Sequence, residues 1–161
     1  MTAIMPGDNI AAMASEEEAR TSAWVEITQD MIDRFGAATL DLDPMHVDPE
    51  WAKAGPFGTT IAFGFLTAGL LTHLLHDALG DGPVTDPDRT GYYLNYGFDR
   101  MRLVAPVPVG ARVRGHFKLL GRTSDSKGRQ IARFDCVIEI ENGERPALVA
   151  EWLSMWVPPR Q

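Results

Sequence analysis

The sequence predicts an α+β domain in which a five-stranded antiparallel sheet packs on one long central helix. Two observations predict this class. The segment Phe63–Leu79 is apolar almost all round, which is typical of a helix covered by other elements. After Thr90 the chain changes to long segments rich in β-branched and aromatic residues, separated by short polar breaks. An earlier segment, Ser22–Ile27, supplies the fifth strand.

The second half of the chain is expected to hold four long strands. Their expected ranges are Gly91–Leu103, Arg112–Gly121, Arg129–Glu141 and Pro146–Val157. Because the breaks between them are short, we expect each strand to pair with the next in an antiparallel meander. Cys136 shares its alternation with the apolar residues of its strand, which predicts a buried cysteine that behaves as a small hydrophobe.

The first half of the chain predicts short helices on either side of a loop. Thr28 is a good N-cap for an amphipathic stripe, so a helix is expected to run from there to about Ala38. The residues Asp41–His46 are then expected to form a loop stiffened by Pro44. An Asp-Pro pair after this loop predicts a second helix, Pro49–Ala54.

Length and composition fit a single domain. The chain has 161 residues, of which 45% are hydrophobic and 23% charged, as in ordinary globular proteins. We expect residues 1–20 to form a partly ordered N-terminal arm and residues 21–161 to form one domain. The formal net charge of −7 argues against a nucleic-acid partner. No apolar run reaches the roughly 18 residues of a membrane span, and no signal-peptide pattern opens the sequence.

The distribution of charge along the chain gives information on a possible ligand, and the cysteine content gives information on the cellular compartment. Residues 91–161 carry 11 Lys and Arg against 7 Asp and Glu, whereas residues 1–90 carry 4 against 15. This asymmetry indicates either two solvated surfaces or a source of cations for an anionic ligand. A single cysteine excludes a disulfide within the chain and fits a cytoplasmic location.

Two motifs in the first half carry the functional signal. The stretch Asp41–Asp48 places carboxylates, a proline and a histidine at fixed spacing, and Ile61–Gly64 leads a glycine into the long helix. With the later segment Leu103–Gly110, these motifs resemble the MaoC-like dehydratase family, which includes the (R)-specific enoyl-CoA hydratases. The resemblance covers about residues 27–157. It is closest to the branch that contains the nodulation protein NodN.

The resemblance implies a hotdog fold and a reaction. The reaction is hydration of a trans-2-enoyl-CoA thioester to the (R)-3-hydroxyacyl-CoA thioester, or the reverse. Asp41 and His46 are implied to hold the water, with Asp41 as principal base and His46 positioning the water and transferring the proton. The backbone N–H of Gly64 is implied to stabilise the enolate oxygen. The sequence departs from the family pattern at Asp43, where Asn is usual, and at Phe63, where many members have His.

The resemblance also implies which partners to expect. The family needs no metal or redox cofactor, and CoA belongs to the acyl-thioester substrate. His73 and His76 lack further ligands for a metal and are interpreted as helix-surface residues. We expect Thr72 to bond back to its own helix, and His116 to be an ordinary strand-face residue. Because an isolated sheet of this kind exposes a long edge, we expect a homodimer joined edge to edge.

Two other functions stay open on the sequence. A hotdog thioesterase normally places a carboxylate on the central helix, where this sequence offers only Asp77. A non-catalytic module would keep the fold and bind an acyl thioester or another lipid-like ligand without turnover. The polar segment Asp81–Arg89 and the residues around Trp51–Phe57 are expected to shape the acyl pocket in either case.

Overall fold

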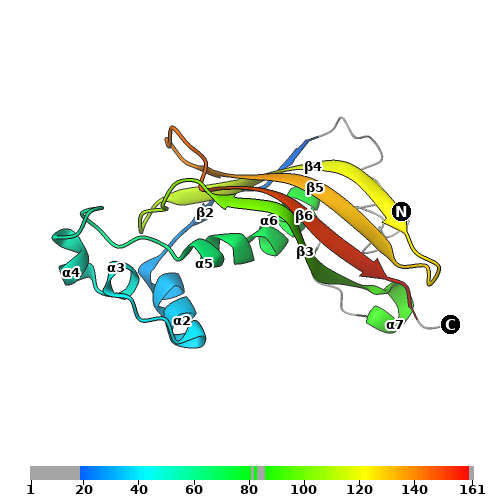
Figure 1. Cartoon of the computed structure of the whole chain (residues 1–161), viewed down its shortest axis with the longest axis horizontal. Coiled ribbons are helices and arrows are strands. Elements are labelled where there is room, and N and C mark those ends of the chain that lie inside the picture. Colours follow the sequence, from blue (N-terminus) through cyan, green and yellow to red (C-terminus); the bar gives the residue numbers. More distant parts are fainter. Residues whose placement is uncertain (1–18, 81, 83–85, 160–161) are drawn as a thin grey trace.

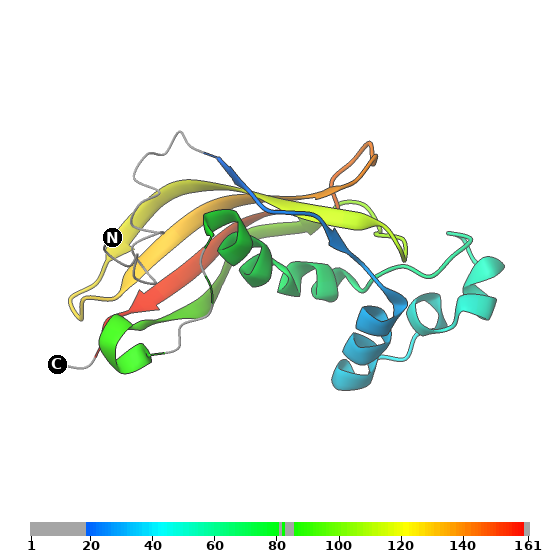
Figure 2. The ribbon, with the colours of Figure 1, turned by 180° about the vertical axis from the view of Figure 1, so that it is seen from behind.

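A curved antiparallel sheet lies over two consecutive helices, α5 (Gly64–Gly69) and α6 (Leu71–Leu79), in the computed structural model of the chain (Figures 1 and 2). Three helices, α2 (Gln29–Thr39), α3 (Pro44–Val47) and α4 (Pro49–Lys53), lie together beyond one end of the sheet. The structure describes residues 19–80, 82 and 86–159. Residues 1–18 of the expected arm therefore lie outside the described residues.

The sheet contains four long strands close to the predicted ranges. They are β3 (Tyr92–Leu103), β4 (Arg112–Ser124), β5 (Gln130–Ile140) and β6 (Leu148–Val157). The strand order is β1-β4-β5-β6-β3, so the predicted meander is wrong at its first step: β3 pairs with β6 and not with β4. The segment between β3 and β4 is not a tight turn, because it bonds to the chain before α5: Ala62 N–H donates to Val107 O at 2.8 Å and Val109 N–H to Thr60 O at 3.0 Å.

The early strand is two short strands, so the sheet has six strands and not five. Both β1 (Arg20–Thr21) and β2 (Val25–Glu26) pair with β4. The ladder is interrupted at Ala23, whose N–H turns away from the sheet to donate to the Asp77 carboxylate on α6 at 2.6 Å. One side-chain acceptor on the helix thus divides a strand that the apolar pattern predicts as continuous.

The central helix is likewise divided. The N–H of Leu70 is shared between the carbonyls of Leu66 and Thr67, each at 3.2 Å, and this tightened turn separates α5 from α6. The inner side of α6 is buried against the concave face of the sheet. The core there comprises Leu71, Leu74, Leu75, Phe117, Phe134, Cys136, Ile138, Leu148 and Trp152. The predicted burial of Cys136 is confirmed, whereas Phe65 is largely exposed.

The helices beyond the sheet follow their capping residues. Thr28 caps α2 by accepting from Met31 N–H, as predicted. The predicted loop Asp41–His46 is wrong in its second half, because Asp43 accepts from Met45 N–H at 2.9 Å and starts α3 with a proline at its first position. His46 therefore lies on a helical turn.

The polar segment after α6 also contains a helix. The turn α7 (Pro87–Thr90) occupies the end of the expected loop Asp81–Arg89, and residues 81 and 83–85 lie outside the described residues. Within the described ranges, no helix has the length and apolar character needed to cross a bilayer.

Candidate active site

His46 is held by hydrogen bonding and by ring contact. Its Nδ1 lies 2.7 Å from the carbonyl oxygen of Ile61. A carbonyl only accepts, so in the neutral ring Nδ1 carries the proton and Nε2 keeps a free lone pair. The ring of Phe63 lies against the imidazole with centroids 3.9 Å apart. Phe63 is itself packed against Phe35, with ring centroids 5.2 Å apart. The site therefore presents a histidine of defined tautomer on an apolar support.

His46 and Gly64 line the same cavity, which has a volume of about 250 Å³. The rest of its lining is almost entirely apolar and comes from α3, from the segment before α5 and from the chain around the end of β3. These residues are Met45, Ile61, Ala62, Thr67, Leu103, Val104, Ala105, Pro106, Val107 and Ala147. An apolar lining lowers the local dielectric and so strengthens the electrostatic interactions of the few polar groups inside it.

Gly64 brings a backbone amide into this cavity. It is the first residue of α5, so its N–H has no intrahelical partner, and no side chain caps the helix. A methyl group added at Gly64 would collide with Cδ1 of Leu103. The absence of a side chain therefore lets β3 approach the start of the helix and leaves the amide accessible.

Asp41 occupies a different position. Its side chain is exposed and does not line the cavity that His46 and Gly64 share. The Asp41 N–H donates to Gly36 O at 3.0 Å, and its carboxylate accepts from Asp43 N–H at 3.2 Å. The structure thus brings two of the three predicted site residues together and anchors Asp41 in the turn between α2 and α3.

Three residues that support the site were missed by reasoning from the sequence. A side chain at Gly36 would meet Asp41 O at 2.7 Å, so only glycine lets the Asp41 turn pack on α2. The Gln29 amide donates to His46 O at 2.8 Å and accepts from the Thr60 hydroxyl at 2.6 Å. A glycine inside a predicted helix was a usable signal for Gly36, whereas nothing local marks Gln29 or Thr60.

A second, larger cavity of about 760 Å³ lies between α6, α7 and the paired strands β3 and β6. Its lining is Thr72, Leu75, His76, Pro87, Asp88, Tyr92, Tyr93, Leu94, Asn95, Trp152, Ser154, Val157, Pro158 and Pro159. Thr72 donates to Asn95 Oδ1 at 3.3 Å, so the predicted bond back to its own helix is wrong. Of the segments expected to shape an acyl pocket, Asp81–Arg89 contributes Pro87 and Asp88, while Trp51–Phe57 contributes no lining residue.

His73 is exposed and His76 lines the larger cavity. Among the residues that the structure describes, no group of three or more His, Cys, Asp or Glu side chains is arranged to hold a metal ion.

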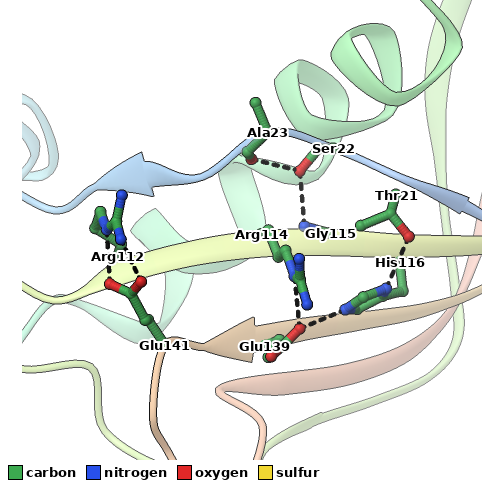
Figure 3. A network of polar contacts seen from close by, with 9 residues as sticks. All are labelled: Thr21, Ser22, Ala23, Arg112, Arg114, Gly115, His116, Glu139 and Glu141. Carbon is green, nitrogen blue, oxygen red and sulfur yellow. Dashed lines mark hydrogen bonds and ion pairs between the residues drawn. The ribbon is translucent and has the colours of Figure 1, made fainter.

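His116 is a strand-face residue, as expected, and belongs to a polar network on the outer face of β4 and β5 (Figure 3). Its Nε2–H donates to Glu139 at 2.6 Å, and its Nδ1 lies 3.0 Å from the Thr21 hydroxyl. Arg114 donates to the same carboxylate at 2.7 Å. These hydrogen bonds, first that of Arg114 and then that of His116, lower the pKa of Glu139.

Arg112 forms a second pair beside this network, with Nε 2.6 Å from the Glu141 carboxylate. This hydrogen bond raises the pKa of Arg112 and lowers that of Glu141. The cations drawn in Figure 3 are thus matched by carboxylates of the same face. The solvated-surface interpretation suits these residues better than a site for an anionic ligand.

The chain is similar to a known domain family and to named proteins over most of its length. The MaoC like domain matches residues 11–138. The chain is 42% identical over 146 residues to 3-hydroxyacyl-thioester dehydratase Z of Mycobacterium tuberculosis. The aligned region covers 91% of this chain and 93% of that protein. It is 40% identical over 144 residues to nodulation protein N of Rhizobium meliloti, covering 86% of this chain and 84% of the relative.

Solved structures show the same fold. The (R)-hydratase from A. caviae involved in PHA biosynthesis superposes with a TM-score of 0.67 at 22% identity, covering 88% of this chain and 95% of that chain. At this identity the likeness concerns the fold. It confirms the predicted arrangement of an antiparallel sheet around a central helix.

Proposed function

The chain belongs to the MaoC-like dehydratase family, and on this premise we propose that it adds water to a 2-enoyl thioester, or removes it from the (R)-3-hydroxyacyl thioester. The acyl carrier we propose is CoA, bound as part of the substrate. No metal or redox cofactor enters the proposed reaction. The chain would then be a hydro-lyase.

The single observation that supports this function most is the tautomer of His46, which the hydrogen bond to Ile61 O defines. Because Nδ1–H is engaged by Ile61 O, Nε2 of the neutral ring is an acceptor, in a cavity that also contains the start of α5. An acceptor nitrogen beside a backbone donor is what addition of water to an unsaturated thioester requires.

The proposed reaction uses three groups. His46 Nε2 accepts a hydrogen bond from the water and orients it. Asp41, whose exposed side chain lies in the turn outside the cavity, is the proposed acceptor of the water proton as the water oxygen bonds to C3. The C2–C3 π electrons move toward the carbonyl, and the resulting enolate oxygen accepts a hydrogen bond from Gly64 N–H. The proton that Asp41 took is then transferred through His46 Nε2 to C2, so both side chains regain their starting protonation states and the elements of water have been added. Dehydration follows the same steps in reverse.

Asp43 has a capping role in this scheme. Its carboxylate accepts from Met45 N–H at the start of α3, and an asparagine side chain performs the same function. This explains how the chain can carry Asp where the family usually has Asn. The proposed catalytic carboxylate is therefore Asp41 alone.

The larger cavity is the proposed place for the distal part of the acyl group. Pockets that bind small molecules commonly measure about 300–1,000 Å³ and are mostly apolar. The cavity of about 760 Å³ falls in this range and has aromatic walls. Thr72, Asn95 and Trp152 also line an intervening hollow of about 230 Å³ that includes Ala68, next to Thr67 of the His46 cavity.

We further propose that the chain forms a homodimer through β3. This strand ends the sheet order, so one of its edges has no partner within the described chain. It also carries partly exposed large apolar side chains, namely Tyr92, Leu94, Tyr96, Phe98 and Leu103. A long apolar edge strand is normally covered by a partner.

We also propose a cytoplasmic location, which is inferred from the single cysteine.

The decisive experiment follows hydration of crotonyl-CoA through loss of the enoyl absorbance. The wild type should turn over, and Asp41→Asn and His46→Gln should each lower kcat by about 10²–10⁴-fold, the usual contribution of a general acid or base. Asp43→Asn is the matched control for Asp41→Asn: it makes the same chemical change two residues away and should keep near-wild-type activity.

The alternatives predict different results in this assay. A wild type that binds acyl-CoA without turnover would support a non-catalytic module. Release of free CoA thiol would indicate a thioesterase, for which Asp77 is poorly placed because its carboxylate accepts from Ala23 N–H. Full activity in Asp41→Asn or His46→Gln would refute the assignment of that residue.

A further inference from the structure

The Gln29 side chain joins three segments that are distant in the sequence. Its Nε2 donates to His46 O on α3 at 2.8 Å and to the Asp33 carboxylate, one turn along α2, also at 2.8 Å. Its Oε1 accepts from the Thr60 hydroxyl at 2.6 Å. One amide therefore ties the first turn of α2 to the turn that carries His46 and to the chain that leads into α5.

The chemistry of these partners fixes the orientation of the amide. A backbone carbonyl and a carboxylate only accept, so they must face the NH₂ group. The Thr60 hydroxyl is then left to donate to Oε1. A flipped amide, or a glutamate at this position, would place an oxygen against two other acceptor oxygens.

The same network closes on the imidazole. Thr60 is followed by Ile61, whose carbonyl accepts from His46 Nδ1 at 2.7 Å and whose N–H donates to Met45 O at 3.3 Å. His46 is thus held at both ends: the Gln29 amide holds its backbone carbonyl, and Ile61 holds its ring. Both contacts lead back to the segment that contains Thr60.

Thr60 is placed to make this connection rigid. It is 1% exposed, and its carbonyl accepts from Val109 N–H at 3.0 Å. A buried hydroxyl whose partner is removed, or a buried amide oxygen left without a donor, has an unfavourable free energy, so the paired arrangement is strongly preferred. The neighbouring Thr59 is only partly buried, unlike Thr60.

We propose that Gln29 and Thr60 are positioning residues that fix the orientation and tautomer of His46. The proposal rests on the proposed hydratase function for its kinetic consequence only. Neither residue lines the cavity, so they act through His46 and not on the substrate. Their loss should disturb catalysis more than substrate binding.

The test compares Thr60→Val, which removes the hydroxyl at nearly constant shape, with Thr60→Ser, which restores it, and with Thr59→Val as the matched control. With crotonyl-CoA, Thr60→Val should lower kcat by about 10- to 100-fold, the range expected when a catalytic group is misplaced, with KM changed by about twofold or less. Thr60→Ser should recover most of kcat, and Thr59→Val should match the wild type.

A second readout does not depend on activity. The imidazole ¹⁵N shifts of His46 report its tautomer, which should be Nδ1–H in the wild type and in Thr60→Ser, and mixed in Thr60→Val. Gln29→Glu should act like Thr60→Val, with Gln130→Glu on an exposed part of β5 as its control.

The outcomes separate the two proposals. Wild-type kcat together with an unchanged His46 tautomer in folded Thr60→Val or Gln29→Glu would overturn the positioning role, even if the enzyme is a hydratase. An inactive wild type whose tautomer still responds to Thr60→Val would refute the hydratase and retain the positioning role. Should Thr60→Val fail to fold, the positioning role is tested by the kcat and the His46 tautomer of Gln29→Glu, compared with those of Thr60→Ser.

Discussion

At the scale of single residues, the absence of a side chain at Gly64 shapes the cavity. The Cβ of an alanine would meet Leu103, which lines the cavity and would have to move. Gly64→Ala should therefore lower kcat/KM for crotonyl-CoA by about 10-fold or more, because crowding displaces the substrate carbonyl from the amide.

Gly69 provides the matched control for this change. It ends the same helix, and a Cβ built there meets nothing within 4 Å. Gly69→Ala should leave turnover near the wild-type rate, as measured in the same assay. Equal losses in the two variants would show that helix flexibility, and not access to the Gly64 amide, is what matters.

Cys136 illustrates the opposite case, a reactive residue type made inert by its surroundings. It is fully buried between the sheet and α6, and burial raises the pKa of its thiol to about 12. The native protein should therefore react with a thiol reagent on the order of 10³-fold more slowly than the denatured chain, since reaction requires the core to open.

An exposed thiol calibrates this measurement. Ser126→Cys, in the exposed turn between β4 and β5, should react at the rate of a free thiol while Cys136 stays protected. Rapid modification of the wild type under native conditions would contradict the buried position of Cys136.

At the scale of elements, local chemistry predicts much of the fold and non-local contacts decide the rest. Alternation gives the four long strands within a few residues. It could not give the pairing of β3 with β6, because that choice depends on residues 104–111 bonding to the chain before α5. The start of α3 could have been predicted from the sequence. Asp43-Pro44 is the same combination of an N-cap and a proline that correctly predicts α4 from Asp48-Pro49.

The candidate site divides in the same way. Spacing along the chain points to His46 and Gly64, which the structure brings to one cavity. Sequence separation hides the contact between Gln29 and Thr60, which lie 31 residues apart. Such a pair becomes visible only when the register of the intervening helices is known.

The β4–β5 ladder predicts a pH-dependent contribution to stability. Hydrogen bonds from Arg114 and His116 lower the pKa of Glu139, so the ionised carboxylate stabilises the folded state. This contribution is present at neutral pH and is lost as the pH falls below about 4.3, the ordinary value for Glu, and through the lower folded pKa. Because the pair is partly exposed, it should amount to about 1 kcal/mol or less.

Urea denaturation of Glu139→Gln measures this contribution. The variant should be less stable than the wild type at pH 7, and the difference should shrink between pH 7 and pH 3 as the wild-type carboxyl group becomes protonated as well. Glu144→Gln, in the exposed turn before β6, should show no such difference at either pH. A constant difference across this range would exclude an ionic origin.

At the scale of the whole molecule, the proposed dimer depends on which edge of the sheet is covered. On the β3 edge, Leu94 is 47% exposed, and on the opposite side of the sheet Leu120 of β4 is 38% exposed. A charged side chain in a buried apolar contact is strongly unfavourable, whereas at a solvent-facing position it has little effect. Leu94→Arg should therefore convert the dimer into a monomer, and Leu120→Arg should leave it intact, as measured by light scattering coupled to size-exclusion chromatography. Dissociation by Leu120→Arg alone would place the interface on β4, and a monomeric wild type would refute the dimer itself.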